Sequence, residues 1–529
     1  MKKLLDIYKK HQFLLLLLVN VLFVIFITSV FCWHYESNDD LVMAWIASGK
    51  FIGSPDYHLV FINAVYGFVL LWLYSVFPMV EWYTLLFLTF HVLSITIIAK
   101  WFLNLKIRFY LKIAILMLVY LIEVRMLLLL QFTTTAGILA LAAFVLLLGG
   151  RKKDLVFGTL LFVLASLVRF QAAMLVGLVF CFFYPLYIYL FSFSLPQFLA
   201  LIICLLLSVS FKIVDRRIYH SDPEWDYYYK YNEVRGKLND NPNNWRAYDH
   251  LPDSVIKEDY KMLTWYFFPD PSVLDLETLE KIHNTIETQT RFGSVSYIRK
   301  IKNIWPSMKG YLLYFLTLVP LFTFVVVGVE GRKRKLLYAL CFVGLLLVFS
   351  WISMNAIVKE RAFLCAYIAF LVFILVPADK VKISFSPVIL AGVLIVIFGL
   401  AYKYLPVLKF PKDNDNSKEE QKYMLERIGK PVVLGELFTS SLNPMRLQDD
   451  DFNVPLYASG WTTLMPKCDC VNSYKELINQ SIPIVIGFDK GALNDVCETL
   501  QTSILFHYNI ETSCRILMET ENYVVFCLK

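Results

Sequence analysis

Two adjacent carboxylates, Asp39 and Asp40, follow a long apolar run near the start of the chain. Neighbouring carboxylates repel each other and are costly to desolvate together, so such a pair usually handles a proton, a cation or a metal ion. Either residue could act as a general base toward a hydroxyl, and both together could hold Mg²⁺ or Mn²⁺. The alternative is structural: Asn38 and Asp39 cap a short amphipathic helix over 40–51, and Asp40 stabilises its positive end.

Three basic residues could bind an anion such as a departing phosphate, which needs cations to hold its developing charge. Arg169 stands in an otherwise apolar stretch, while Lys359 and Arg361 lie between two apolar segments. The alternatives are snorkelling to a membrane interface for Arg169 and a solvated loop with an internal ion pair for 359–361.

Weaker candidates for substrate binding are His58, Gln131 and Arg235. His58 could orient a substrate at the start of an apolar segment, or simply occupy the interface. Gln131 stands at the expected outer end of a helix. Arg235 follows an aromatic run over 225–229, which could stack on a sugar ring but is also typical of the core of a small domain.

The elements that position these residues must lie in a membrane. Of 529 residues, 58% are hydrophobic and 18% charged, and the mean hydropathy of +0.58 indicates more apolar surface than a soluble fold could bury. Apolar runs near the ~20 residues that cross ~30 Å of hydrocarbon recur along the chain. The formal net charge of +7 comes with basic runs at 151–153 and 332–335, which are typical of cytoplasmic loops and do not indicate a nucleic-acid partner.

Twelve apolar segments are candidate spans: about 13–32, 58–77, 83–103, 109–129, 132–148, 155–170, 172–192, 196–214, 309–329, 336–354, 362–377 and 386–405. The first lacks a small-residue cleavage site, so we interpret it as a retained helix and not a signal peptide. Placing the basic runs inside requires that one segment does not cross. We expect 109–129 to be a broken or re-entrant element, because Glu123 and Arg125 interrupt it. About eleven crossings follow, with the N-terminus inside and the C-terminus outside, which leaves Lys100, Lys106, Arg108 and Lys112 on the outer face.

The predicted fold class is mainly α, a polytopic transmembrane helix bundle with two exported regions. Residues 1–214 form an N-terminal transmembrane module whose first outer loop, 33–57, carries the carboxylates, and 309–405 form the C-terminal transmembrane helices. Residues 215–308 form a large exported cap with a helix over 273–290. Residues 406–529 form an exported α/β or α+β domain that opens with a charged linker over 411–422. Five cysteines in this last part allow one or two disulfides.

This layout has acidic residues in the loop after the first helix, then a surface helix, a multi-helix bundle and an exported C-terminal domain. It resembles the GT-C superfamily of glycosyltransferases, which take sugars from polyprenyl-phosphate donors. The resemblance covers the whole chain but includes few motifs, and Asp39 and Asp40 match its acidic position. It implies that Asp40 or Asp39 is the base and that Arg169, Lys359 and Arg361 bind the donor phosphate.

The resemblance implies an inverting glycosyltransferase in a bacterial cytoplasmic membrane. Its partners would be a polyprenyl-phosphate-linked sugar donor, membrane lipids, and a cell-envelope glycan, lipid or protein as acceptor at the outer face. The family often has a second acidic residue where this chain has Gln131, so the need for a divalent cation stays open.

Two other functions remain as alternatives. A transporter or flippase of lipid-linked saccharides would need ionisable residues deep within several spans. A polymerase or ligase of surface polysaccharide is chemically close, and the sequence does not separate it from the first interpretation. ATP-driven and zinc-dependent chemistry is not expected, because the chain has no phosphate-binding glycine loop and no paired Cys/His spacing.

Overall fold

The computed structural model describes residues 2–529 with gaps. The longer gaps fall at 292–300, 323–330, 377–386, 410–422, 434–442 and 448–455. The shorter ones fall at 242–243, 266, 268–269, 301, 303, 317, 319–321, 425, 446, 488–489 and 521–522. The linker predicted over 411–422 therefore lies outside the described residues.

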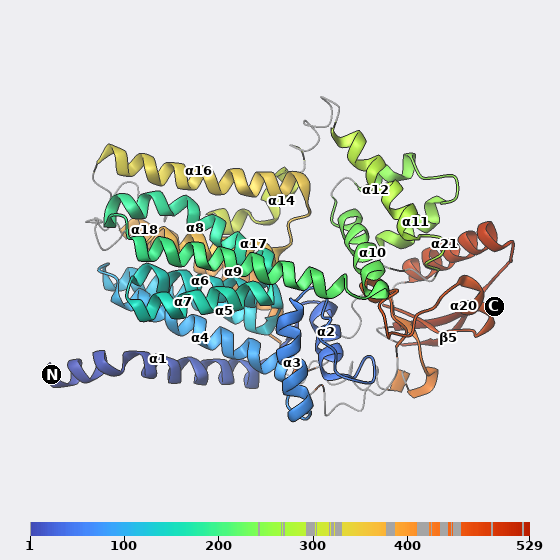
Figure 1. Ribbon diagram of the computed structural model, residues 1–529, viewed down its shortest axis with the longest axis horizontal. Coiled ribbons are helices and arrows are strands. Elements are labelled where there is room, and N and C mark those ends of the chain that lie inside the picture. Colours follow the sequence, from blue (N-terminus) through green and yellow to red (C-terminus); the bar gives the residue numbers. More distant parts are fainter. Residues whose placement is uncertain are drawn as a thin grey trace.

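Long helices form one bundle, and the cap and the C-terminal sheet lie together at one of its ends (Figure 1). The bundle helices are α1 (Lys2–Val30), α4 (Trp82–Asn104), α5 (Phe109–Leu128), α6 (Phe132–Gly149), α7 (Lys152–Val168), α8 (Phe170–Phe191), α9 (Leu195–Tyr219), α16 (Arg332–Asn355), α17 (Glu360–Phe373) and α18 (Pro387–Tyr404). Among the described helices, seven are long and apolar enough to cross a membrane: α1, α4, α6, α8, α9, α16 and α18. The predicted mainly helical membrane fold is confirmed, while the number of crossings stays a prediction.

Polar side chains inside the bundle are paired with one another. On α1, Leu18 and Leu22 are exposed, as expected of a face turned toward lipid, whereas Asn20 is fully buried. The Asn20 side chain donates to Thr96 Oγ1 of α4 at 3.0 Å and accepts from Tyr120 Oη of α5 at 2.6 Å. These hydrogen bonds join three helices where an unpaired polar group would be costly.

The prediction that 109–129 is broken is wrong, because α5 is a continuous helix of 20 residues. Its two charged residues do not interrupt it, since each faces a partner inside the protein. Glu123 Oε1 lies 2.9 Å from His91 Nδ1, and Arg125 Nη2 lies 2.7 Å from Glu36 Oε1. Directly after α5, the strand β2 (Leu129–Leu130) pairs in parallel with β1 (His34–Tyr35), which follows α1. Helices α1 and α5 therefore end at the same end of the bundle.

The segment predicted to span at 58–77 forms a shorter helix, α3 (Ala64–Val76), of 13 residues. At about 1.5 Å per residue this helix is ~20 Å long, which is less than the hydrocarbon thickness of ~30 Å. It lies across the direction of the long helices (Figure 1), and its first amide, Ala64 N, donates to Asp215 Oδ1 near the end of α9. If α3 replaces 109–129 as the segment that does not cross, eleven crossings remain. The basic residues between 100 and 112 then fall on the same side as the run at 151–153.

The elements beyond the bundle are short helices and a small sheet. They comprise α2 (Asn38–Ser48) in the first loop, the cap helices α10 (Pro223–Asn239), η1 (Asn244–Asp249), α11 (Lys257–Thr264) and α12 (Leu276–Arg291), α14 (Ile304–Gly310) after the cap, and η3 (Leu405–Val407), η5 (Gly460–Thr462), α20 (Tyr474–Asn479) and α21 (Lys490–Tyr508) in the last part. The strands β3 (Val432–Val433), β4 (Ile484–Gly487), β6 (Tyr523–Leu528) and β5 (Cys514–Glu519) form a sheet in the order β3-β4-β6-β5. Strands β3 and β4 are parallel, and β6 is antiparallel to both of its neighbours. The helix predicted over 273–290 is α12, and the C-terminal part mixes strands and helices as expected.

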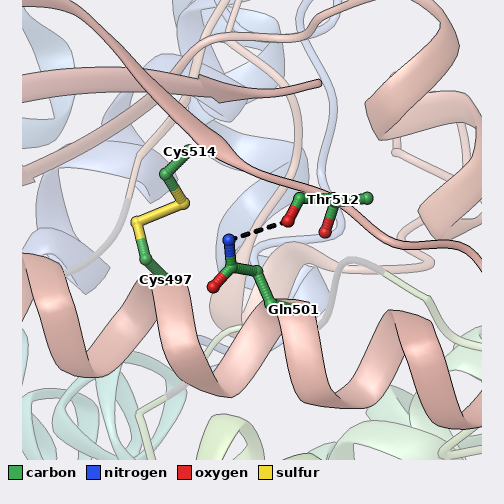
Figure 2. Close-up of a disulfide and its surroundings, with 4 residues drawn as sticks. All are labelled: Cys497, Gln501, Thr512 and Cys514. Carbon is green, nitrogen blue, oxygen red and sulfur yellow. Dashed lines mark hydrogen bonds between the residues drawn. A yellow bond between two sulfur atoms is a disulfide. The ribbon is translucent and has the colours of Figure 1, made fainter.

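One disulfide, Cys497–Cys514, joins α21 to β5 (Figure 2). Beside it, Gln501 Nε2 of α21 donates to the carbonyl oxygen of Thr512 at 2.9 Å. The other eight cysteines of the chain are free. Disulfides persist mainly outside the reducing cytoplasm, so this bond supports the prediction that the C-terminal domain is exported.

We expect the native chain, unfolded without reductant, to expose eight thiols that react with a maleimide, and ten after reduction. The reason is that only a domain exported to an oxidising compartment keeps the bond between Cys497 and Cys514. Mass spectrometry of the labelled protein counts the thiols. A count of ten before reduction would place the domain in a reducing compartment.

Candidate active site

A cavity of about 600 Å³ lies at the end of the bundle next to the cap and the C-terminal sheet. Segments far apart in the chain line it: the starts of α2, α6, α8 and α17, the end of α16, α10 of the cap, and residues 433 and 459–461. Its charged lining residues are Asp39, Arg169, Arg235, Asp240, Lys359 and Arg361. The cavity thus brings together five of the eight site residues predicted from the sequence, and Asp240 was not among those predicted.

The two adjacent carboxylates face different surroundings. They are neighbours on the first turn of α2, and successive helical residues point about 100° apart. Asp39 lines the cavity, whereas Asp40 is fully buried outside it. Asp40 Oδ1 accepts hydrogen bonds from Tyr83 Oη at 2.9 Å and from the amide of Phe132 at 3.0 Å. Of the two candidate carboxylates, Asp39 is therefore the one that lines the cavity.

Burial also makes Asp40 a weaker acid. It raises the pKa of Asp40 well above its ordinary value, although the hydrogen bond from Tyr83 opposes the shift. Asp40 therefore joins α2 to the starts of α4 and α6, and it is suited to fixing the position of its neighbour Asp39.

The start of α17 brings two cations to the cavity. Arg361 Nη2 lies 3.6 Å from Asp39 Oδ2, and both side chains are less than one fifth exposed. Lys359, just before the helix, lies 3.0 Å from Asp240 Oδ1 at the end of α10, and this pair is about half exposed. Since exposed pairs contribute little and are easily exchanged for other partners, Lys359 is free to turn to an anion.

Arg169 stands at the break between α7 and α8, where the chain is extended. Its Nη1 donates to the carbonyl oxygen of Phe61 at 3.1 Å, and its guanidinium lies 5.1 Å from the ring centre of Phe132. No carboxylate pairs with it among the described residues. Burial, and then the neighbouring charge of Arg361, lower the pKa of Arg169 to about 10, so the group remains charged at neutral pH.

The described lining residues carry an excess of positive charge. Arg235 of α10 is nearly buried, and its guanidinium donates two hydrogen bonds to Asn232 Oδ1 at 3.1 and 2.6 Å. With Arg235 included, four cations face two carboxylates, Asp39 and Asp240. The excess of two positive charges is what a phosphate monoester dianion would neutralise.

One part of the cavity wall is apolar. It extends between the bundle helices α8, α16 and α17 and the segment after α14 and is lined by Leu175, Phe315, Leu318, Leu345, Val348, Phe349, Ile352, Phe363 and Ala366. On the side of the cap and the C-terminal domain, Trp265 and Trp461 line the same cavity. One cavity therefore offers an apolar groove, a cationic centre and two indole rings, which suits a ligand with a lipid tail, a phosphate and a polar head.

The residues present do not fit a metal ion held jointly by Asp39 and Asp40. Asp39 Oδ2 faces Arg361, while Asp40 Oδ1 is occupied by two donors and lies outside the cavity. Among the described residues, no group of three or more His, Cys, Asp or Glu side chains could hold a metal. We derive no step through a metal at this pair.

His58 and Gln131 do not line the cavity. The His58 ring lies 2.7 Å from Asp56 Oδ1 and stacks on Trp225 of the cap at 3.9 Å between ring centres. Asp56 also pairs with Lys467 of the C-terminal domain, so His58 helps to join the first loop to the cap and to the C-terminal domain. The fully buried Gln131 caps α6, because its Oε1 accepts from the amides of Thr133 and Thr134. Both residues thus have structural partners, and Thr133 beside Gln131 lines the cavity.

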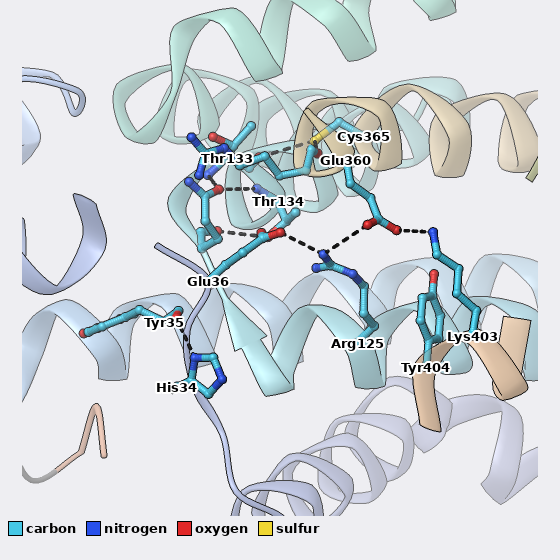
Figure 3. A network of polar contacts seen from close by, with 12 residues as sticks. His34, Tyr35, Glu36, Arg125, Thr133, Thr134, Glu360, Cys365, Lys403 and Tyr404 are labelled. Atoms are coloured by element: carbon cyan, nitrogen blue, oxygen red, sulfur yellow. Dashed lines mark hydrogen bonds and ion pairs between the residues drawn. The ribbon is translucent and has the colours of Figure 1, made fainter. Parts of the chain in front are cut away.

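A row of alternating charges lies beside the cavity (Figure 3). Arg125 of α5 contacts Glu36 Oε1 at 2.7 Å and Glu360 Oε2 at 3.8 Å. Lys403 of α18 lies 2.7 Å from Glu360 Oε1, and Tyr314 Oη also donates to that oxygen. None of these residues is among the site residues predicted from the sequence. A signal was present, since Glu36 and Glu360 each stand close in the chain to a predicted site residue.

Together, the fold and the cavity define a membrane protein that can receive an amphipathic anion at one end of its bundle. No protein-family model matches the sequence, and no curated protein matches it. Among solved structures, the chain is similar to ArnT from Cupriavidus metallidurans in the apo state, with 12% sequence identity, 98% of each chain covered and a TM-score of 0.41. A likeness at this level transfers no residue roles.

Proposed function

We propose that this protein is a membrane glycosyltransferase that moves a sugar, with inversion, from a polyprenyl-phosphate-linked donor to a cell-envelope acceptor at the outer face. The observation that carries the proposal is that Asp39, Arg169 and Arg361 line one cavity that continues into an apolar groove. The groove would hold the polyprenyl chain and the cations its phosphate.

Asp39 would serve as the general base. In the transfer, an acceptor oxygen forms a bond to C1 of the sugar while the bond from C1 to the phosphate oxygen breaks. The acceptor proton goes to Asp39, and the electron pair of the broken bond goes to the phosphate. Donor binding draws Arg361 from Asp39 to the phosphate, which leaves the carboxylate available for the acceptor hydroxyl.

The charge of the cavity matches the leaving group better than the substrate. A polyprenyl-phosphate sugar is a phosphodiester with one negative charge, and the departing polyprenyl phosphate approaches two. As the bond breaks, Asp39 takes up the acceptor proton and loses its negative charge while the phosphate gains one. The cations beside the phosphate therefore attract the transition state more strongly than the ground state.

The transporter alternative receives less support from the same residues. A path for a charged saccharide across the bundle would need ionisable groups along several spans. Within the described part of the bundle, the buried His91 uses both ring nitrogens for hydrogen bonds, one to Glu123 and one to Thr135. The charged residues of the cavity lie at one end of the bundle. A polymerase or ligase uses the same bond chemistry, and only the acceptor distinguishes it.

Cleavage of the donor tests the proposed function without knowledge of the acceptor. In membranes that contain the wild-type chain, polyprenyl-phosphate-linked sugars should fall and free polyprenyl phosphate should rise, as measured by mass spectrometry of lipid extracts. Membranes with the Asp226→Asn variant, which alters an aspartate of α10 outside the cavity, should behave like the wild type. Movement of intact donor between leaflets without release of polyprenyl phosphate would overturn the proposal in favour of a flippase.

A further inference from the structure

Arg125 lies between two carboxylates that come from separate walls of the cavity. The same atom, Nη2, contacts Glu36 Oε1 at 2.7 Å and Glu360 Oε2 at 3.8 Å (Figure 3). The guanidinium is 5% exposed, so water screens these contacts weakly. A planar fork with several donors can hold two carboxylates at once, whereas an ammonium acts as a single point charge.

The two carboxylates stand close in the chain to the proposed base and the proposed phosphate ligand. Glu36 stands three residues before Asp39, and Glu360 stands directly before Arg361. Asp39 and Arg361 are themselves 3.6 Å apart across the cavity. Arg125 therefore forms a second link between the loop that carries the proposed base and the helix start that carries the proposed phosphate ligand.

Each carboxylate has further support on its far side. Glu360 is also paired with Lys403 of α18, at 2.7 Å. The backbone amide of Glu36 donates to the carbonyl oxygen of Leu130 at 3.0 Å, which continues the pairing of β1 with β2 after α5. The loop before α2 is thus fixed to α5 by backbone as well as by side chain. The start of α17 reaches α5 through the contact between Arg125 and Glu360.

We propose that Arg125 is a positioning residue that sets the approach of Asp39 to Arg361. The expected effect on turnover rests on the proposed function. The expected effect on the structure of the two cavity segments rests on the contacts alone. Without Arg125, Glu36 and Glu360 face each other as like charges, so the two walls separate and the base and the phosphate ligand lose their common alignment. Lys403 cannot replace Arg125, because it reaches only Glu360 among the described ion pairs.

Hydrogen–deuterium exchange of the full chain tests the structural consequence. In Arg125→Gln, peptides that cover 36–41 and 359–363 should exchange at least about tenfold faster, because local opening there loses its restraint. The peptide that covers 165–172 should match the wild type. The control is Glu123→Gln, a change in the same helix. Glu123 is buried and pairs with His91, and it does not contact Glu36 or Glu360. Unchanged exchange at both cavity segments, or a rise over the whole chain, would overturn the proposal.

The effect on catalysis is tested with a double variant that removes the contact of Arg125 without changing the net charge. Glu36→Gln with Arg125→Gln removes one charge of each sign and leaves Glu360 paired with Lys403. Turnover of donor should fall at least about tenfold in the single and the double variant, while the affinity for undecaprenyl phosphate changes less than about threefold, since the ligands of the phosphate remain. Arg125→Lys should recover part of the turnover. If the double variant turned over donor at the wild-type rate, positioning by Arg125 would be refuted. If the wild type cleaved no donor but Arg125→Gln still exchanged faster at both segments, the proposed function would be refuted and the structural role of Arg125 would stand.

Discussion

Replacing Asp39 by asparagine is expected to lower donor cleavage by about 10²- to 10⁴-fold, the usual contribution of a general base. Asparagine has nearly the shape of aspartate but cannot accept the acceptor proton. Asp39 is the only carboxylate that the described part of the cavity places against a buried guanidinium, since Asp240 pairs with a half-exposed lysine. Free polyprenyl phosphate released in native membranes measures the rate, and the amount of folded protein is compared by size-exclusion chromatography.

The matched control is the same change at the next residue. In Asp40→Asn the side-chain oxygen can still accept from Tyr83 and from the amide of Phe132, so the joint between α2, α4 and α6 is kept. Asp40 is buried outside the cavity, so its replacement leaves the charges of the cavity lining unchanged. We expect a loss of less than about tenfold for Asp40→Asn. If Asp40→Asn abolishes cleavage while Asp39→Asn retains it, the roles of the two residues must be exchanged.

The sequence could predict the presence of an acidic pair but not which member faces the cavity. That outcome depends on Tyr83 and Phe132, which lie 43 and 92 residues away in the chain. Neighbours on a helix turn always face different ways, and only the packing of the helix decides which of them is buried. The convergence of Arg169, Arg235 and Arg361 depends in the same way on how three distant segments pack.

The wrong prediction of a break within 109–129 has a similar cause. Charges within 109–129 were interpreted as a break, because their partners could not be identified from sequence. In the fold, Glu123 meets His91 and Arg125 meets Glu36, so the helix remains continuous. Hydropathy alone could not show that 58–77 contains a helix of only 13 residues, since the residues before it are equally apolar but form turns. Composition determined the class of the fold, whereas pairing between distant residues determined its details.

Replacing Arg361 by glutamine is expected to lower donor cleavage by about 10²- to 10³-fold, the range found when one preorganised donor to a developing negative charge is lost. Arg361 is mostly buried and lies next to Asp39, so its charge acts on the departing phosphate through a poorly screened medium. The variant lacks the cation that pairs with Asp39, at the place where the negative charge of the departing phosphate develops.

The matched control for this variant is Lys359→Gln, two residues earlier. Lys359 is about half exposed and already paired with Asp240, so its removal should cost less than about tenfold. Arg361→Lys should fall between the two, because the charge is kept while the planar fork that can grip two phosphate oxygens is lost. The rates should therefore rank as wild type, Lys359→Gln, Arg361→Lys and Arg361→Gln. An equal loss in Lys359→Gln and Arg361→Gln would mean that the phosphate is held by general attraction in the cavity and not by a ligand placed beside the base.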